Sequence, residues 1–280
     1  MHFTDRVALW DTVKPYSLQF YPKEDFPRTN IQHTPCETTI HSMRARTPAP
    51  SLAVEGFAVQ TLASKMAYAD FSDEATIEAV YCSELESHLA RALGDGVRNV
   101  RVLDYQRRHK VSSFPYFQGR LPPGPQPSLM THADVTPAAV EAIVRSLYVH
   151  ADAILQARYM VVTAWKPLRF PVHDWPLAIC DATTLDRARD LLPSDVVYPQ
   201  YVAENYMVHY SPRQKWYWLP DHQPDEILVF KAFDSGDAGS WPCAHGAFPL
   251  PGQQEEAPSR QSIDVRLLVT YADAEYTKKA

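Results

Sequence analysis

Two histidine–aspartate pairs, each with one residue between its members, mark places where the chain could bind a metal ion. One pair is His132 with Asp134, and the other is His150 with Asp152. The second pair falls within an amphipathic helical pattern, where residues i and i+2 project from nearly opposite sides and cannot share an ion. The first pair lies just before the cap of that helix, where an extended backbone directs both side chains to one face. We therefore predict that His132 and Asp134 chelate one metal ion.

A third ligand is needed for an iron site of the two-histidine, one-carboxylate type, and His245 is the best candidate. It lies in a β-rich part of the chain, and its small neighbours Ala244, Gly246 and Ala247 leave space around an imidazole. Three such ligands occupy one face of an octahedron around Fe(II) and leave positions for a co-substrate and oxygen. The same three side chains could also hold a catalytic zinc ion, so a zinc hydrolase stays open as an alternative.

An arginine and a serine follow His245 at a spacing that suits the binding of a carboxylate. Arg260 lies 15 residues after His245, and Ser262 projects from the same face of the strand expected there. A guanidinium and a hydroxyl together can hold a carboxylate by a charge-assisted fork and one further hydrogen bond, which suits the distal carboxylate of 2-oxoglutarate. Arg266 also falls on this face, but it lies roughly 20 Å along the strand and ranks second as a co-substrate ligand.

Two amphipathic helices are expected to flank these residues. The first begins at Ser72 or Asp73, carries apolar residues at helical spacing, and ends at the glycines of 94–96. The second has Thr136 as its cap and Pro137 in its first turn, and its apolar face continues to Leu155.

The second half of the chain has the pattern of an antiparallel β core. Short runs rich in β-branched and aromatic residues alternate with turn residues, and no helices separate them. This pattern predicts a mainly β fold with flanking helices, built on a double-stranded β-helix, or jelly-roll, core. We expect one structural domain overall, in which residues 1–110 form an α/β extension packed on the core of residues 111–280. The strands are expected at 158–165, 175–181, 204–210, 214–219, 226–233 and 262–271.

Composition excludes several other classes of protein. With 280 residues and 45% hydrophobic content, the chain can form a sizeable core, and a formal net charge of −6 argues against nucleic acid or an anionic membrane as partner. No apolar run approaches the roughly 20 residues of a membrane span, and the start lacks the pattern of a secretory signal, so a cytoplasmic location is expected. The four cysteines are far apart, which indicates small buried groups rather than a zinc site.

Several blocks of sequence, in the same order, resemble the Fe(II)/2-oxoglutarate hydroxylase/desaturase family, which includes fungal secondary-metabolite enzymes. The similarity extends from about Leu52 to Tyr271. Within this family the chain is most similar to the hydroxylase component of the bacterial cephamycin 7α-methoxylation system. The blocks that carry the resemblance are the His132–Asp134 unit and the segments Trp165–Asp181, Trp216–Ser235 and Ala244–Arg266.

The resemblance implies a complete set of site residues and a reaction. His132, Asp134 and His245 would be the Fe(II) ligands, and Arg260 with Ser262 would hold 2-oxoglutarate, with O2 as co-substrate. The implied reaction is hydroxylation of an unactivated C–H bond of a small secondary metabolite. The similarity to the cephamycin component implies C7 of a cephem β-lactam as the target, with a separate methyltransferase as partner to complete the methoxy group.

Other interpretations stay open beside this one. The same cofactors could support desaturation or ring formation on another metabolite, and a non-catalytic accessory jelly roll would use no metal chemistry. The sequence also departs from many relatives at Lys166, where arginine is common, and at Gly246, where a hydroxyl residue is common. The spacing from His245 to Arg260 and Ser262 favours the oxygenase over both non-oxidative alternatives.

Overall fold

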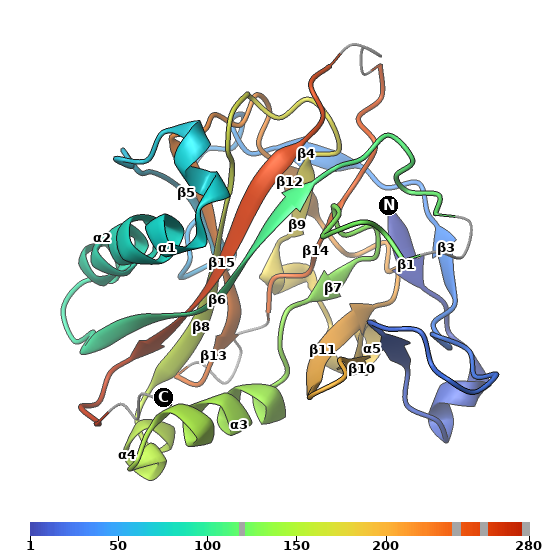
Figure 1. The fold of residues 1–280 in the computed structure, drawn as a ribbon, viewed down its shortest axis with the longest axis horizontal. Coiled ribbons are helices and arrows are strands. Elements are labelled where there is room, and N and C mark those ends of the chain that lie inside the picture. The colour runs from blue at the N-terminus through green and yellow to red at the C-terminus, as the bar shows by residue number, and fades with distance from the viewer. Residues whose placement is uncertain (118–120, 237–241, 253–256, 276–280) are drawn as a thin grey trace.

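Two large β-sheets form most of the computed structural model, which describes residues 1–117, 121–236, 242–252 and 257–275 (Figure 1). The strands are β1 (His2–Thr4), β2 (Tyr16–Leu18), β3 (His33–Pro35), β4 (Ile40–Ser42), β5 (Phe57–Thr61), β6 (Asn99–His109), β7 (His132–Ala133), β8 (Tyr159–Pro167), β9 (Leu177–Cys180), β10 (Leu191–Val197), β11 (Val202–Val208), β12 (Trp216–Trp218), β13 (Glu226–Asp234), β14 (His245–Ala247) and β15 (Gln261–Thr270). The helices are η1 (Ala8–Asp11), η2 (Tyr68–Ser72), α1 (Glu74–Thr76), η3 (Ile77–Cys82), α2 (Ser83–Leu93), α3 (Pro137–Leu147), α4 (Ala151–Leu155), η4 (Ala182–Thr184) and α5 (Arg187–Asp190).

In both large sheets, the edge strands come from the N-terminal part of the chain. One sheet has eight strands in the order β2-β10-β11-β7-β14-β9-β12-β4, and the other has five in the order β5-β13-β8-β15-β6. All four edge strands, β2, β4, β5 and β6, come from the first 110 residues, and every inner strand comes from the rest. Both parts therefore share both sheets, and the division at residue 110 stays a prediction.

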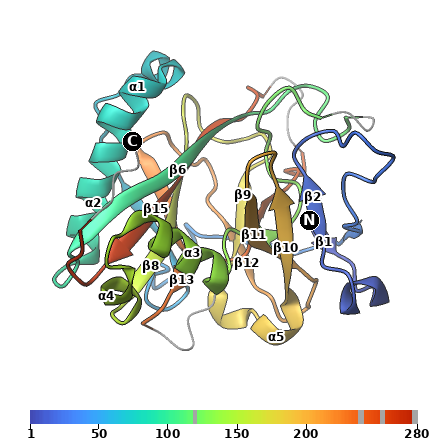
Figure 2. The same ribbon diagram turned by 60° about the horizontal axis from the view of Figure 1, so that its bottom comes forward.

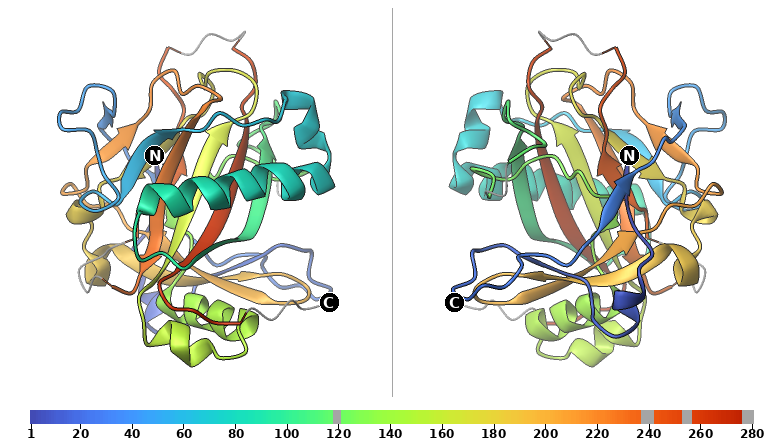
Figure 3. Two further views of the ribbon diagram at one scale, coloured as in Figure 1. Left: turned by 90° about the vertical axis from the view of Figure 1, so that its left-hand side faces the viewer. Right: turned by 90° about the vertical axis from the view of Figure 1, so that its right-hand side faces the viewer.

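The two sheets face each other with apolar side chains between them. A helix covers the outer face of the smaller sheet (Figure 2). Trp165, Leu228 and Phe230 of the five-stranded sheet pack against Leu177 and Ile179 of the eight-stranded sheet. On the outer face, α2 crosses the strands (Figure 3) and buries its apolar side against them. This mainly β architecture with two facing sheets confirms the predicted jelly-roll core.

The first predicted helix is confirmed, and the second is wrong in its extent. Asp73 caps the first through its side chain, and Gly94 ends the helical stretch with a positive φ of 79°. The second stretch forms two helices, because Tyr148 adopts an extended conformation and the amide of Val149 donates to the carbonyl of Glu275. His150 therefore occupies the N-cap position of the short α4 instead of lying inside a helix.

All six predicted strand regions of the second half contain strands, namely β8, β9, β11, β12, β13 and β15. Among the described residues, no helix has the length and apolar character needed to cross a lipid bilayer.

Candidate functional site

Three side chains from distant parts of the chain meet between neighbouring strands of the eight-stranded sheet. His132 lies on β7, His245 lies on β14, and the two residues are paired in the sheet. Asp134 follows β7, and its Oδ1 atom lies 3.7 Å from His132 Nε2 and 3.4 Å from His245 Nε2. One potential ligand atom from each residue lies within 4.8 Å of the other two. The structure thus brings together all three residues predicted to bind metal.

Hydrogen bonds from the far side of each imidazole leave the metal-facing nitrogen available. His132 Nδ1 lies 2.9 Å from the carbonyl oxygen of Met130, and His245 Nδ1 lies 3.1 Å from that of Cys243. A carbonyl oxygen can only accept, so each Nδ1 carries the proton and each Nε2 keeps its lone pair. Burial, together with the second imidazole, lowers the pKa of His132 to about 4, which favours this neutral form.

The carboxylate of Asp134 is held by Thr163, which is not among the site residues predicted from the sequence. Thr163 on β8 donates its hydroxyl to Asp134 Oδ2 at 2.5 Å, which leaves Oδ1 directed at the two histidines. Burial alone would raise the pKa of Asp134, but His245 and His132 outweigh that effect and hold the pKa well below its usual range. Thr163 is a hydroxyl residue in an otherwise apolar buried part of β8, which was a usable signal in the sequence.

Arg260 and Ser262 lie side by side in the layer between the sheets. Arg260 Nε donates to Ser262 Oγ at 3.2 Å and Nη1 donates to the carbonyl of Trp175 at 2.5 Å, while the guanidinium stacks over the ring of Trp165 at 4.9 Å. The whole residue is only 4% exposed. Among the ion pairs of the described residues, none joins Arg260 to a carboxylate. Burial lowers the pKa of this guanidinium to about 9.

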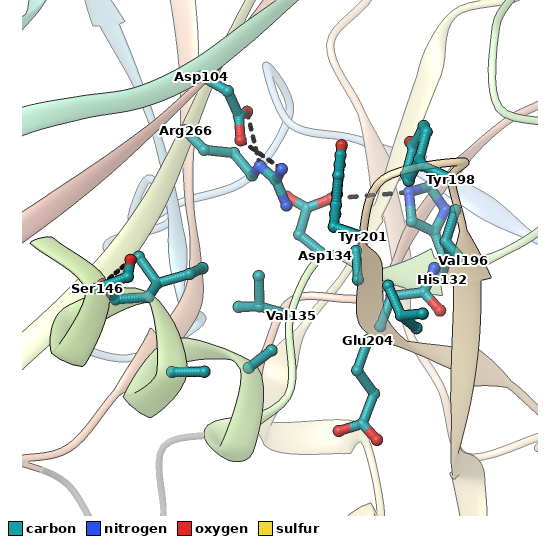
Figure 4. Close-up of a pocket in the computed structure, with 16 residues that line it drawn as sticks. Asp104, His132, Asp134, Val135, Ser146, Val196, Tyr198, Tyr201, Glu204 and Arg266 are labelled. Carbon is teal, nitrogen blue, oxygen red and sulfur yellow. Dashed lines mark hydrogen bonds and ion pairs between the residues drawn. The ribbon is translucent and has the colours of Figure 1, made fainter. Parts of the chain in front are cut away.

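Arg266 occupies a different place from Arg260. Its guanidinium pairs with Asp104 on β6, with Nε 2.8 Å from Oδ1 and Nη2 2.5 Å from Oδ2. It lines a cavity of about 560 Å³ together with His132 and Asp134. Figure 4 shows Arg266 between Asp104 and Asp134. Arg266 thus lies beside the candidate metal ligands, and Arg260 does not line this cavity.

The Lys166 departure has no consequence for this site, because the side chain faces the other way. Its Nζ lies 5.3 Å from the ring centres of both Phe71 and Tyr81, in the core under the helical stretch, and burial lowers its pKa to about 8. Lys166 therefore points away from the candidate site. Successive residues of a strand point to opposite faces, so Lys166 is turned away while Trp165 faces the site.

The donor set fits Fe(II). Two neutral imidazoles and one carboxylate, each fixed by a further hydrogen bond, form the facial arrangement that non-haem iron oxygenases use. The buried guanidinium of Arg260 fits an anionic co-substrate. Asp264 and Asp174 favour its charged form, but burial and Arg108 outweigh them and lower its pKa, so a further carboxylate would stabilise the cation.

Comparisons with known proteins agree with this chemistry. A family model described as an oxidoreductase/YMDC permease-like domain matches residues 1–270. The Fe(II)/2-oxoglutarate-dependent dioxygenase nvfI of Aspergillus novofumigatus is 31% identical over 258 residues, which cover 89% of this chain and 88% of that protein. The hydroxylase/desaturase efuI of Hormonema carpetanum is 27% identical over 266 residues, which cover 88% of each chain.

A solved structure extends the similarity to the whole fold. The iron and alpha-ketoglutarate-dependent endoperoxidase NvfI superposes with a TM-score of 0.81 at 28% identity, and the match covers 98% of this chain and 97% of that chain.

Proposed function

Since this chain belongs to the Fe(II)/2-oxoglutarate-dependent dioxygenase family, with hydroxylase and desaturase relatives in fungal secondary metabolism, we propose that it hydroxylates an unactivated C–H bond of a small metabolite. The observation that carries the proposal is the convergence of His132, Asp134 and His245 on one point. An oxygenase of this kind also needs a site for the co-substrate. The buried guanidinium of Arg260 can bind a carboxylate of 2-oxoglutarate.

We propose specific tasks for the residues of the site. His132, Asp134 and His245 would hold the iron, and Thr163 would keep Asp134 oriented. Arg260 and Ser262 would bind the distal carboxylate of 2-oxoglutarate, with Trp165 supporting the guanidinium from below. When bound, the iron supplies the activation of O2 that is coupled to the oxidation of 2-oxoglutarate to succinate.

The narrower substrate proposal concerns C7 of a cephem β-lactam, and its support is the sequence resemblance to the cephamycin hydroxylase component. A methyltransferase partner and a cytoplasmic location belong to the same proposal. The alternative is desaturation or ring formation on another metabolite with the same cofactors. The names of the relatives, which include hydroxylase/desaturase and endoperoxidase, support that alternative.

The test is succinate release from Fe(II)-loaded protein that is mixed with 2-oxoglutarate anaerobically and then exposed to air, with a panel of β-lactams and other small metabolites. We expect succinate and a product that has gained one oxygen atom. A product that has lost two hydrogens would instead support desaturation. Activity that requires Zn(II) and ignores 2-oxoglutarate and oxygen would overturn the proposal.

A matched pair of variants makes this test specific to the site. His132→Ala should abolish Fe(II) binding and succinate release, whereas His150→Ala changes the same motif away from the site and should leave both intact. Arg260→Met should raise the KM for 2-oxoglutarate at least tenfold, because it removes a charge-assisted hydrogen bond. Retention of full activity in His132→Ala would rule out the proposed metal site.

A further inference from the structure

The cavity beside the metal ligands has walls of contrasting chemistry. Its volume is about 560 Å³. Helix α3 supplies one wall, where Ala139, Ala142 and Ile143 present small apolar groups. The connection between β10 and β11 supplies the opposite wall through Tyr198 and Tyr201, whose rings stack with centres 4.6 Å apart and planes 16° apart. The apolar body of a small molecule would fit between these walls.

The Arg266–Asp104 pair forms a polar corner in this cavity. Arg266 on β15 lies directly opposite Asp104 on β6 in the sheet, and two parallel hydrogen bonds fix the plane of the guanidinium. Its positive charge is neutralised by Asp104, but within the described residues no hydrogen bond engages Nη1. The corner therefore offers oriented N–H donors without a net charge.

The other carboxylates around the cavity are also compensated. Glu204 pairs with Lys14 and accepts a hydrogen bond from the hydroxyl of Thr136. Asp134 faces the two histidines and accepts from Thr163. If a ligand placed a carboxylate at Arg266, that carboxylate would meet a guanidinium already paired with Asp104. The carboxylates of Asp104, Asp134 and Glu204 would repel it. A neutral oxygen would form the hydrogen bond without this repulsion.

We propose that Arg266, held by Asp104, donates a hydrogen bond to a neutral acceptor oxygen of the substrate, a carbonyl or hydroxyl, while the apolar body of the substrate packs between α3 and Tyr201. This inference rests on the proposed function, because it places that oxygen beside the metal ligands (Figure 4). The oxygen would fix which C–H bond faces the iron, so Arg266 is a residue that determines specificity. A β-lactam carbonyl is one acceptor of this kind.

Three caged probes of nearly equal size test the proposal: 2-adamantanone as a neutral acceptor, adamantane-1-carboxylate as an anion, and 1-adamantanamine as a cation. Dissociation constants would be measured by calorimetry without oxygen, on protein loaded with Fe(II) and 2-oxoglutarate. We expect the ketone to bind most tightly. Arg266→Met should weaken ketone binding about tenfold, the usual worth of one hydrogen bond from a charged donor. Asp104→Asn should improve carboxylate binding about tenfold relative to the ketone, because it frees the positive charge.

Two further variants show that the probes occupy this cavity. In Ala142→Leu, the larger side chain extends from α3 into the cavity and should abolish the binding of all three probes. Ala153→Leu changes an exposed alanine of α4 that does not line this cavity, and it should change the binding of none of the three probes. If Arg266→Met does not fold, the double variant Asp104→Leu with Arg266→Met replaces the ion pair by apolar groups and should likewise lose the preference for the ketone.

Some results would overturn the proposal. One is tightest binding of the carboxylate to the native protein, and another is unchanged ketone affinity in Arg266→Met. A third is an Arg266→Met variant that loses affinity for 2-oxoglutarate alone, which would assign the residue to the co-substrate. These titrations involve no turnover. Ketone selectivity without succinate release would therefore contradict only the proposed function, and succinate release without ketone selectivity would contradict only this inference.

Discussion

At the scale of single residues, the site depends on side chains that hold the candidate ligands from behind. Each histidine is fixed by a backbone carbonyl at Nδ1, and Asp134 is fixed by Thr163. Contacts of this kind set the tautomer and orientation of a ligand, and their loss typically costs about 10- to 100-fold in metal affinity. The ligands themselves were predictable from sequence, because a His-x-Asp unit on extended backbone has defined geometry. Thr163 was not predicted, because its partner Asp134 lies in a different segment of the chain, 29 residues away.

Thr163→Val should weaken Fe(II) binding by about 10-fold or more while the fold is retained, because valine preserves the shape and removes the hydroxyl. Anaerobic metal titration measures the affinity, and circular dichroism checks the fold. Thr61→Val, at the exposed end of β5, is the control and should bind iron normally. Equal affinities in the two variants would show that the hydroxyl does not support the metal ligand.

Acid should destabilise the protein in part through His222. This residue is 2% exposed, its Nε2 lies 3.0 Å from the carbonyl oxygen of Glu226, and burial lowers its pKa to about 4. The unfolded chain therefore binds a proton near pH 6.5 that the folded chain resists until about pH 4, so stability falls as the pH decreases through this window. The contribution of His222 is on the order of 3 kcal/mol.

Chemical denaturation at pH 7 and pH 4.5 would measure this effect. His222→Gln keeps a neutral donor and should reduce the loss of stability at pH 4.5, whereas His150→Gln changes an exposed histidine and should behave like the native protein. A loss of the same size in all three proteins would assign the acid sensitivity to other groups.

At the scale of elements, α3 connects the metal site to the cavity wall. It begins three residues after Asp134, and the Thr136 side chain accepts a hydrogen bond from the amide of Ala139 at 3.2 Å. The same hydroxyl donates to Glu204 on β11. Thr136 therefore ties the first turn of α3 to the sheet that carries the histidines.

Thr136→Ala should lower the free energy of unfolding by about 1 kcal/mol or somewhat more, because it removes the helix cap and the bond to Glu204. This corresponds to a decrease of about 2–4 °C in Tm. Thr136→Ser retains a capping hydroxyl and should stay close to the native Tm. A similar decrease in both variants would show that packing of the methyl group, rather than the cap, is responsible.

The predictability of the elements follows from their length. The first helix and the long strands repeat an apolar pattern over enough residues to be recognised in the sequence. β7 and β14 consist of two and three residues, so they show no period of their own, although they carry both histidines. The break between α3 and α4 was missed because the apolar spacing continues across it, while the extended backbone at Tyr148 depends on contacts from distant residues.

At the scale of the whole molecule, the two parts of the chain depend on each other. Residues 1–110 supply the outer strands of both large sheets, and residues 111–280 supply the inner ones. Exposed strand edges with unpaired backbone groups promote association between chains. Which strands pair with which could not be read from the sequence, because pairing joins residues far apart in the chain.

Residues 111–280 expressed alone should therefore aggregate, and co-expression with residues 1–110 should recover material of native size. Size-exclusion chromatography and circular dichroism measure both outcomes. The full chain, purified in parallel, is the control. A monomeric and folded 111–280 fragment would show that the inner strands are stable without the edge strands of residues 1–110.

The position of β15 has a consequence for the synthesis of the protein. This strand is synthesised after β8 and β6, yet it lies between them and pairs with both along most of its length. β8 and β6 can take their final places in the sheet only after β15 has been synthesised. Pairing between segments so far apart in the chain is slow. A premature stop just before β15 would remove the strand that joins β6 to the rest of the smaller sheet, and we expect such a product to be recognised by chaperones and degraded.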